Sequence, residues 1–293
     1  MILSDFGRKL YTYIILYSSK DIFAKGICWV ALCVTLPFST QAQSLRHLMP
    51  DSLNPVRKEL HLAVGHANVL DTYLSPITHA GPAVGVLHRA ERLARWGAGK
   101  VSVQGFYSGN VGLLESVADR GRAYSGDLTA AVAWHYNFHL PSKTRLAVGG
   151  MGEVDLGFTY LTRGGNNPAQ GRAGVNLGLS LIAEQPFHLW NRDWNVSAQL
   201  DLPLVGARFT PNYGQSYYEI FSLGNYNKNI QFTHPINAPS ARLFTQISIP
   251  LGRAKLSLGY WGDIRQSELH HLKRHSWNHY FTIGYVRHLA ILR

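Results

Sequence analysis

Ionisable side chains in the middle and second half of the chain are the first candidates for chemistry. If alternate residues of extended segments share a face, several carboxylates and cations point to the same side. Such a set could form an ion path or a catalytic carboxylate pair. A salt-bridge network that fills an interior is the favoured alternative, because buried charges must be paired or hydrated. The residues of this predicted polar network are Arg145, Glu153, Asp155, Arg172, Glu184, Asp201 and Lys255, together with Arg265.

The tyrosine-rich run 213–225 is the most unusual segment of the chain. Tyrosine suits sugars and amphipathic ligands because it combines a flat apolar ring with a hydroxyl group. The run therefore predicts a ligand site, or a plug, made of residues from an external loop. A well-packed loop whose tyrosines seal the structure beneath them is the favoured alternative. The candidate ligand residues are Tyr213, Tyr217, Tyr218, Glu219 and Asn225.

A third candidate is the histidine-rich stretch 268–276, which contains His270, His271 and His275. With Glu219, the first two could supply a base for a hydrolase of lipid or peptide, which we keep as an alternative function. His275 and Ser276 would point to opposite faces of an extended chain, which is wrong for a base and its nucleophile. The histidine spacing matches no recognised metal pattern. A basic loop that touches lipid phosphates explains the stretch better.

Sequence motifs for cofactors and common catalytic centres are missing. The chain has no G-x-x-x-x-G-K-[ST], no H-E-x-x-H, no C-x-x-C and no dinucleotide fingerprint. The glycine-rich stretch 149–152 lies inside a predicted strand, where glycine suits a bend or close packing. We therefore predict no cofactor, no metal and no catalytic residue, and we regard an enzyme as the less favoured interpretation.

The elements that would position these residues have a period of two. In 128–138 one face carries apolar and aromatic residues and the other carries small and polar ones: Leu128, Ala130, Val132, Trp134, Tyr136 and Phe138 against Thr129, Ala131, Ala133, His135 and Asn137. The segments 175–181, 194–202, 255–260 and 281–285 alternate in the same way. Small polar side chains suit the narrow interior of a membrane β-barrel, whose other face meets lipid.

Ten strands are predicted, at 58–69, 77–89, 98–108, 124–139, 145–161, 171–187, 193–207, 240–250, 254–265 and 277–289. Short connections at 90–97, 141–144, 188–192 and 251–253 alternate with longer ones at 109–123, 162–170, 208–239 and 266–276, except that 70–76 is short. This alternation predicts an antiparallel up-and-down transmembrane β-barrel with both ends in the periplasm and long loops outside. A hairpin hidden in 208–239 would make the count twelve. Aromatic residues near strand ends, including Trp261 and Tyr280, predict interfacial girdles.

Composition supports a membrane barrel over a helical membrane protein or a soluble domain. Charged residues are only 15% of the 293 residues, and the mean hydropathy is −0.08. No repeated apolar run of about 20 residues exists, as helical spans would require. The formal net charge of +11 is scattered, which favours anionic lipids over nucleic acid. Both cysteines, Cys28 and Cys33, lie in the predicted targeting segment, so a disulfide framework is excluded.

The N-terminus has the parts of a secretory signal: Lys25, an apolar stretch at 27–38 and a small-x-small site ending at Ala42. We expect a signal peptide at 1–42, a short periplasmic segment at 43–57 and the barrel at 58–293. The first two dozen residues are unusual for a signal and suggest a start codon assigned too early. The expected location is the outer membrane of a Gram-negative bacterium. A single N-terminal anchor is the alternative.

Three stretches resemble a known family: 71–76 (DTYLSP), 166–169 (NNPA) and 213–225 (YGQSYYEIFSLGN). Together they resemble an uncharacterised family of outer-membrane-type proteins, a domain of unknown function, of anaerobic gut-type Gram-negative bacteria. The resemblance covers about residues 58–290 and implies location and fold but no activity. The terminal Arg293 departs from the aromatic ending of that family.

The sequence thus predicts an outer-membrane barrel with a largely plugged lumen and a structural, adhesive or small-solute role. The alternatives are an outer-membrane hydrolase and a soluble periplasmic β-protein. The expected partners are outer-membrane lipids, including lipopolysaccharide phosphates, and the barrel-assembly machinery. We expect a monomer and no nucleic acid partner.

Overall fold

Ten antiparallel strands form a ring in the computed structural model, which describes residues 55–290 except 117, 119, 120, 164, 166 and 253. An eleventh strand, β8 (Ile230–Thr233), pairs only with β7, and one helix, α3 (Tyr217–Phe221), lies in the same connection. The ring strands are β1 (Pro55–Asp71), β2 (Ser75–Leu93), β3 (Val101–Ser116), β4 (Arg122–His139), β5 (Arg145–Leu161), β6 (Ala169–Leu189), β7 (Arg192–Phe209), β9 (Ser240–Leu251), β10 (Ala254–Leu269) and β11 (Leu272–Ala290). The predicted signal peptide at 1–42 and most of the predicted segment 43–57 lie outside the described residues.

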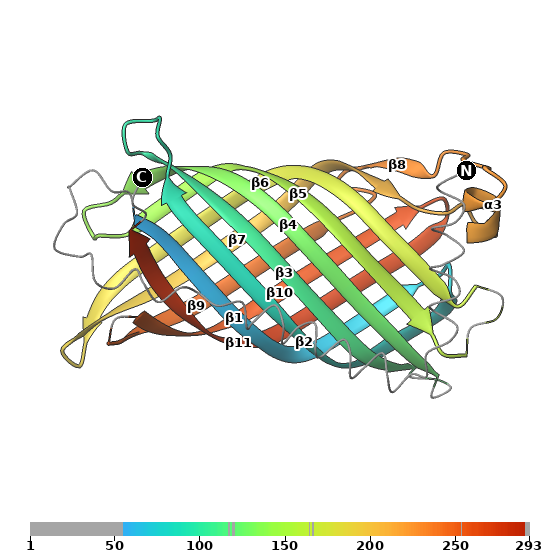
Figure 1. Cartoon of the computed structure of the whole chain (residues 1–293), viewed down its shortest axis with the longest axis horizontal. Helices are drawn as coiled ribbons and strands as arrows, with labels where there is room; N and C mark the ends of the chain where they lie inside the picture. Colours follow the sequence, from blue (N-terminus) through green and yellow to red (C-terminus); the bar gives the residue numbers. More distant parts are fainter. Residues whose placement is uncertain are drawn as a thin grey trace. The chain divides into compact units, whose positions relative to one another are not determined.

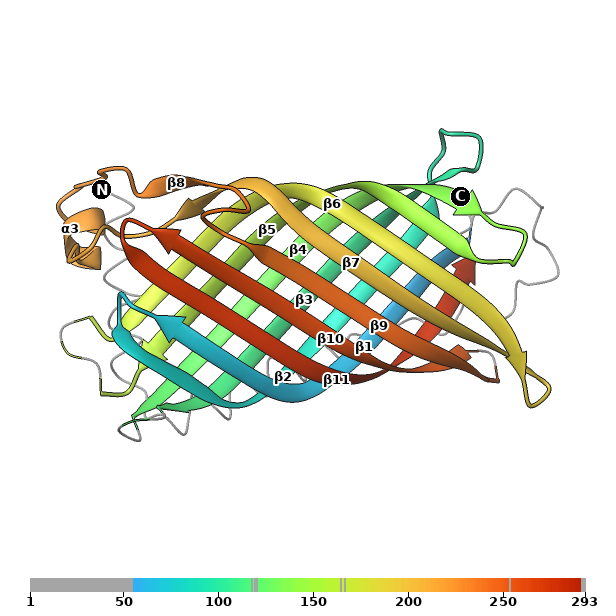
Figure 2. The same cartoon turned by 180° about the vertical axis from the view of Figure 1, so that it is seen from behind.

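The ring is closed, because β6 pairs with β7 and β1 pairs with β11 (Figures 1 and 2). Closure gives every ring strand a partner strand on both sides, so none of the ten described ring strands is an edge strand. The predicted all-β, ten-stranded up-and-down barrel is confirmed. The stretch 208–239 contributes α3 and β8 instead of the further hairpin of the twelve-strand alternative.

The two ends of the barrel differ. Pro55 pairs with Ala290, so the first and last strands begin and end at one mouth, which we call the chain-end mouth. The strand ends that the connections β2–β3, β4–β5, β6–β7 and β9–β10 join also lie there. The opposite end, which we call the loop end, has the strand ends that the connections β1–β2, β3–β4, β5–β6 and β10–β11 join, and it carries the long connection 210–239 with α3 and β8 (Figure 1).

The predicted long connections 109–123 and 266–276 are wrong. Strand β3 continues to Ser116, and β10 and β11 meet at a two-residue turn, His270–His271. Both histidines adopt positive φ, at 51° and 61°, as a tight hairpin turn requires and as histidine tolerates better than most residues. The strands therefore run on through polar residues after the apolar alternation fades, which is why sequence alone shortened them.

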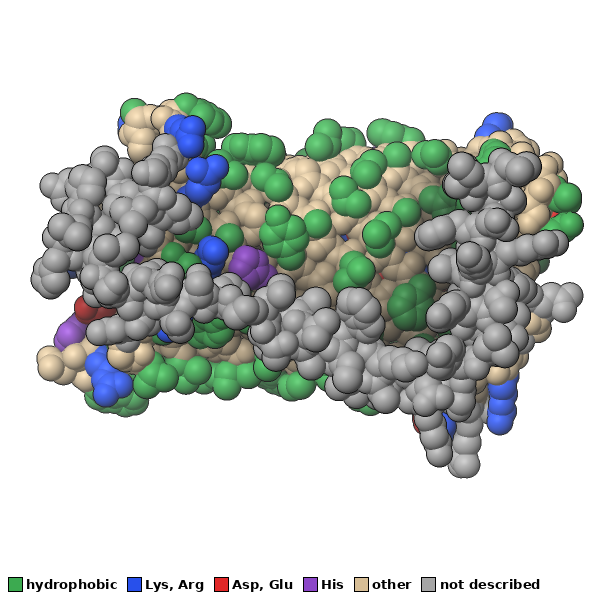
Figure 3. Space-filling model, viewed as in Figure 1, with side chains coloured by type: hydrophobic (Ala, Val, Ile, Leu, Met, Phe, Trp, Pro, Cys, Tyr) green, Lys and Arg blue, Asp and Glu red, His purple; other side chains and the backbone are tan. Residues whose placement is uncertain are grey.

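The two faces of β4 differ as its alternation predicts. The set that begins with Leu128 and ends with Phe138 includes five large exposed apolar side chains, while Thr129, His135 and Asn137 are buried inside. Figure 3 shows hydrophobic side chains spread over the middle of the barrel wall, with Lys and Arg mostly toward its ends. This outer face suits hydrocarbon, and the inner face suits a filled, polar interior. No helix among the described residues is long and apolar enough to cross a membrane.

The barrel interior is not polar throughout, and two predicted girdle residues lie inside it. Trp261 and Tyr280 are 0% and 1% exposed, and their rings stack at 4.7 Å. They must point inward because their neighbours Tyr260 and Phe281 point outward and a strand alternates sides. They belong to an apolar cluster within the lumen that also contains Leu87, Phe106, Leu114 and Phe244.

Candidate functional site

Glu153 forms the centre of an ion-paired cluster halfway along the lumen. Its side chain is fully buried, and it accepts from Arg242 Nη1 at 2.6 Å and lies 3.1 Å from Arg265 Nη1. Arg242 also donates to Asp201 at 2.8 Å, and Arg265 donates to Asp263 at 2.9 Å. Each buried guanidinium therefore meets at least two carboxylates, which is the arrangement that makes burial of such charges tolerable.

Polar contacts cross the lumen between strands that face each other across the ring. In the ring order, β1 and β6, β2 and β7, and β10 and β4 are each five strands apart and so lie on opposite walls. The contacts that join these opposite strands, from the chain-end mouth to the loop end, are Arg57 to Glu184, Arg89 to Gln199 at 2.8 Å, Arg265 to Thr129 at 3.2 Å and Arg172 to Asp71 at 3.9 Å. Side chains from both walls therefore meet at four levels of the lumen in the described part of the chain.

The predicted polar network residues all point into the barrel. Six of them form ion pairs there: Arg145, Glu153, Asp155, Arg172, Glu184 and Asp201. Arg265 belongs to the same network. Lys255 lines the chain-end mouth, where the described residues offer it no ion pair.

Sequence reasoning missed several members of the network, namely Arg57, Glu59, Arg89, Glu91, Arg208, Arg242 and Asp263. For some of these residues the alternation of the sequence could have predicted an inward side chain. In β9, Arg242 is in phase with the inward Gln246 and Ser248, so extending that alternation would have placed it in the lumen.

At the loop end, α3 is fixed by its own N-terminal cap. Ser216 Oγ accepts from the Glu219 backbone N–H at 3.2 Å, and the Glu219 carboxylate accepts from the Ser216 backbone N–H at 2.6 Å. This capping box satisfies backbone groups that a short helix would otherwise leave unpaired. Glu219, a predicted ligand residue, therefore uses its carboxylate locally.

Tyr217 fastens α3 to the barrel rim. Its hydroxyl donates to the Gly171 carbonyl at 3.0 Å and accepts from the Gly171 N–H at 2.8 Å. Tyr73, in the turn between β1 and β2, donates to the Gln215 carbonyl at 2.9 Å and meets the Tyr217 ring edge-to-face at 5.9 Å. Burial raises the pKa of Tyr73 to about 12 and raises the pKa of Tyr217 as well, so both hydroxyls stay protonated donors at neutral pH.

Three of the five predicted ligand residues remain open to solvent. Tyr213 is 78% exposed and Tyr218 is 66% exposed, and the Asn225 side chain is also exposed. The loop that carries them is held by the contacts of Tyr217, Glu219 and Tyr73. The loop end therefore presents aromatic rings on a segment whose backbone is fixed.

The predicted hydrolase residues do not form a catalytic arrangement in the described part of the chain. His270 lies in the β10–β11 turn with Nε2 2.9 Å from the Lys228 carbonyl oxygen, and Glu219 is held in its capping box. A buried Ser–His contact does exist, since Ser180 Oγ lies 2.9 Å from His135 Nε2. However, Asp201 contacts Ser180 itself, at 2.5 Å, and not the histidine that it would have to orient. All three side chains are buried in the lumen.

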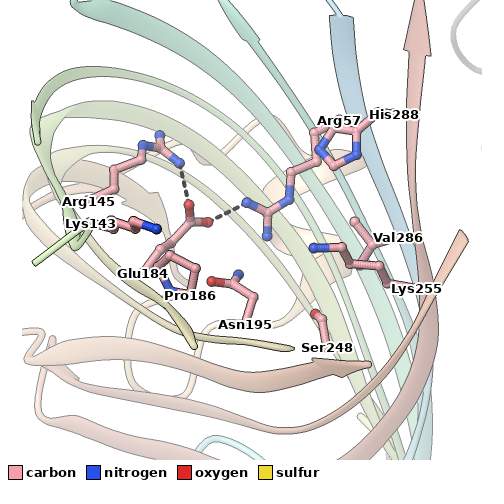
Figure 4. A pocket seen from close by; sticks show the side chains of 10 residues that line it. All are labelled: Arg57, Lys143, Arg145, Glu184, Pro186, Asn195, Ser248, Lys255, Val286 and His288. Atoms are coloured by element: carbon pink, nitrogen blue, oxygen red, sulfur yellow. Dashed lines mark hydrogen bonds and ion pairs between the residues drawn. The ribbon is translucent and has the colours of Figure 1, made fainter. Parts of the chain in front are cut away.

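The chain-end mouth contains a cavity of about 250 Å³ (Figure 4). Its wall includes Arg57, Arg145 and Glu184, and Glu184 is held between the two guanidiniums, with Arg145 Nη1 at 2.9 Å. Lys143 and Lys255 extend into the cavity from opposite sides. Two ends of the barrel are thus candidate binding sites, and ion-paired side chains occupy the lumen between them.

Comparison with solved structures finds a related fold in an outer membrane protein. The outer membrane protease OmpT from Escherichia coli matches with a TM-score of 0.51 and 6% identity, over 82% of this chain and 99% of that chain. The transport unit of the autotransporter AIDA-I from Escherichia coli has a TM-score of 0.35 and 10% identity, over 83% and 94% of the two chains. An outer membrane channel from Pseudomonas putida F1 has a TM-score of 0.33 and 8% identity, over 83% and 100%.

The likeness to the protease concerns the fold alone at this identity. A comparison with curated protein sequences finds no significant match. A family model, by contrast, matches residues 28–293, which is most of the chain and all of the barrel. The resemblance drawn from three sequence stretches is thereby confirmed, and the chain belongs to the family described as "Protein of unknown function (DUF3316)".

Proposed function

We propose that this chain is an outer-membrane barrel that does not conduct and that acts by binding a ligand at its loop end. The observation that carries the proposal is the set of polar contacts between opposite strands, which fill the lumen from Arg57 and Glu184 to Arg172 and Asp71. The lumen of a ten-stranded barrel is narrow compared with that of open porins, which have about 16–18 strands. A filled interior leaves the two ends as the places for function.

Location in the outer membrane, after export by the predicted signal at 1–42, belongs to the same proposal. Its support is the closed ring and the apolar outer face, since a closed sheet with lipid-facing alternate residues is one of the two architectures that span bilayers. The proposed partners are outer-membrane lipids, including lipopolysaccharide phosphates at the loop end, and the barrel-assembly machinery. We propose a monomer, because the ring leaves no ring strand edge for a second copy to extend.

Bilayer recording of protein purified in detergent from the outer-membrane fraction tests the closed lumen. We expect no steady openings, because ions would have to displace buried ion pairs at several levels. Retention of heat-modifiable migration after reconstitution is the control that the barrel is folded. Large steady openings would contradict the filled lumen, and recovery of the protein in the soluble periplasmic fraction would contradict the location.

Tyr213 and Tyr218 are the proposed ligand residues of the loop end. Their exposed rings sit on a fixed loop, so little conformational entropy is lost when a sugar or amphipathic ligand stacks on them. The double change Tyr213→Ala with Tyr218→Ala should abolish retention on immobilised polysaccharide or lipopolysaccharide without lowering the unfolding temperature. The matched control is Tyr107→Ala, which removes an exposed tyrosine from the barrel wall. Unchanged retention by the double variant would remove this site.

A further inference from the structure

Most strands of the ring contribute residues to the wall of the cavity in the chain-end mouth. Its lining residues come from β1, β5, β6, β7, β9, β10 and β11 and from the turn between β4 and β5. With about 250 Å³ it is smaller than the about 300–1,000 Å³ of pockets that take drug-sized ligands. It therefore suits a compact group that reaches the barrel from the side of the chain ends.

Positive charge dominates the lining of this cavity. Arg57, Lys143, Arg145 and Lys255 face one carboxylate, Glu184. The arginines are also held by carboxylates outside the cavity lining, since Arg57 pairs with Glu59 at 2.6 Å and Arg145 pairs with Glu91. Neither lysine takes part in an ion pair within 4.0 Å among the described residues, and the carboxylate that interacts electrostatically with both is the exposed Asp193.

A buried hydroxyl adds a second, independent observation. Ser248 lines the cavity, is 1% exposed, and its Oγ has no hydrogen-bond partner in the described part of the chain. A buried polar group without a partner costs about 1–3 kcal/mol, so its presence needs an explanation. Asn195 lines the same cavity, and Figure 4 shows its amide in the space between Glu184 and Ser248. These groups offer hydrogen-bond donors to an acceptor that carries negative charge.

We propose that the chain-end mouth binds a phosphate group, held by Lys143, Lys255, Ser248 and Asn195 over the guanidinium of Arg57. A phosphate offers several acceptor oxygens and more than one negative charge, which matches two ammonium groups without a close ion pair among the described residues, beside hydroxyl and amide donors. Glu184 does not oppose this, because Arg57 and Arg145 together compensate it. The phosphate comes either from a free anion in solution or from a lipid headgroup that enters the mouth, and the two sources share this chemistry.

Calorimetric titration of the full detergent-purified chain with inorganic phosphate at low ionic strength tests the proposal. We expect saturable binding that weakens at least tenfold in the double variant Lys143→Gln with Lys255→Gln. The matched control, Lys58→Gln with Lys228→Gln, removes the same charge from residues outside the cavity and should bind like the unaltered protein. Ser248→Ala, which keeps every charge, should weaken binding by a smaller factor. Heat-modifiable migration shows that each variant is folded.

A second arm distinguishes the sources by replacing inorganic phosphate with short-chain phosphatidylglycerol. Binding of this lipid but not of inorganic phosphate, with the same loss in the Lys143 and Lys255 variant, identifies a headgroup as the source. Binding of inorganic phosphate alone identifies a free anion. Binding of neither probe, or equal losses in the cavity variant and in the Lys58 and Lys228 control, would overturn the proposal. If the double lysine variant does not fold, the double variant Ser248→Ala with Lys255→Gln replaces it. Its phosphate binding is then compared with that of the unaltered protein and of the Lys58 and Lys228 control in the same way.

Discussion

Replacing Gly149 with alanine should strongly impair assembly of the barrel. Gly149 faces the lumen in β5, and a Cβ atom there would lie 1.8 Å from the carbonyl oxygen of Trp134 in β4. Overpacking in a core costs about 1–3 kcal/mol of stability. We expect a cost near the upper end of this range, because the carbonyl oxygen of Trp134 belongs to a backbone that is held by the strand pairing and cannot move away easily. We expect a large fall in the heat-modifiable fraction after refolding and a lower unfolding temperature for what does fold.

The neighbouring glycine provides a matched control. A Cβ atom on Gly150 points away from the lumen, and its nearest neighbour would be the Gly178 carbonyl oxygen at 4.0 Å, an ordinary contact. Gly150→Ala should therefore assemble normally. Equal behaviour of the two variants would mean that close strand packing at Gly149 does not limit assembly.

Replacing Glu153 with alanine should lower the free energy of unfolding by about 3–5 kcal/mol. Arg242 and Arg265 share this carboxylate, and its loss leaves both buried guanidiniums with an uncompensated part of their charge. Glu153→Gln should recover part of the loss, because the amide oxygen still accepts a hydrogen bond. Urea unfolding in lipid vesicles or detergent, followed by tryptophan fluorescence and gel mobility, measures both changes.

The control for charge alone is Glu115→Ala. Glu115 pairs with Arg122 at 3.5 Å, but both side chains are more than half exposed. Exposed pairs of this kind contribute about 0–1 kcal/mol, so the change should be barely measurable. A loss at Glu115 as large as the loss at Glu153 would show that the lumen network has no special part in stability.

Much of the fold was predictable because lipid and lumen impose opposite demands on alternate residues. In β4 the alternation from Leu128 to Phe138 was long enough to define both faces, and β5 was predicted at the bounds that the structure gives it. The turn at His270–His271 was not predictable, because it lacks the glycine or asparagine that usually marks such turns. Trp261 was misplaced because an aromatic residue near a strand end suits a girdle and a core equally well.

The candidate sites were predictable only in part. The alternation of each strand predicted that Glu153 and Asp201 point into the lumen, but it did not predict which residues they would contact there. Arg242 meets Glu153 across 89 positions of sequence, and only the closed ring brings β9 near β5. The chain-end cavity could not be predicted from the sequence for the same reason. Lys143 lies in the turn between β4 and β5, Lys255 lies in β10, and only the closed ring brings them to one mouth.

The tyrosine-rich run shows the same limit on a smaller scale. Its composition pointed to the loop end, but not to the different parts that its members play. Tyr217 and Tyr218 are adjacent in sequence, yet one is fastened to Gly171 and the other is open to solvent. A helix only five residues long, oriented by its capping box, decides which ring faces the barrel.

The amino-acid sequence left a choice between ten and twelve strands, and by itself it determined the period of two and the outward-facing side of the strands with a long alternation. These are local properties, because each residue needs only its own neighbours to fix its side of a strand. The tertiary structure alone decided which side chains meet across the lumen, and that Lys143, Lys255 and a buried hydroxyl share one mouth. Those features depend on distances between strands far apart in sequence, which the curvature and register of the closed barrel set.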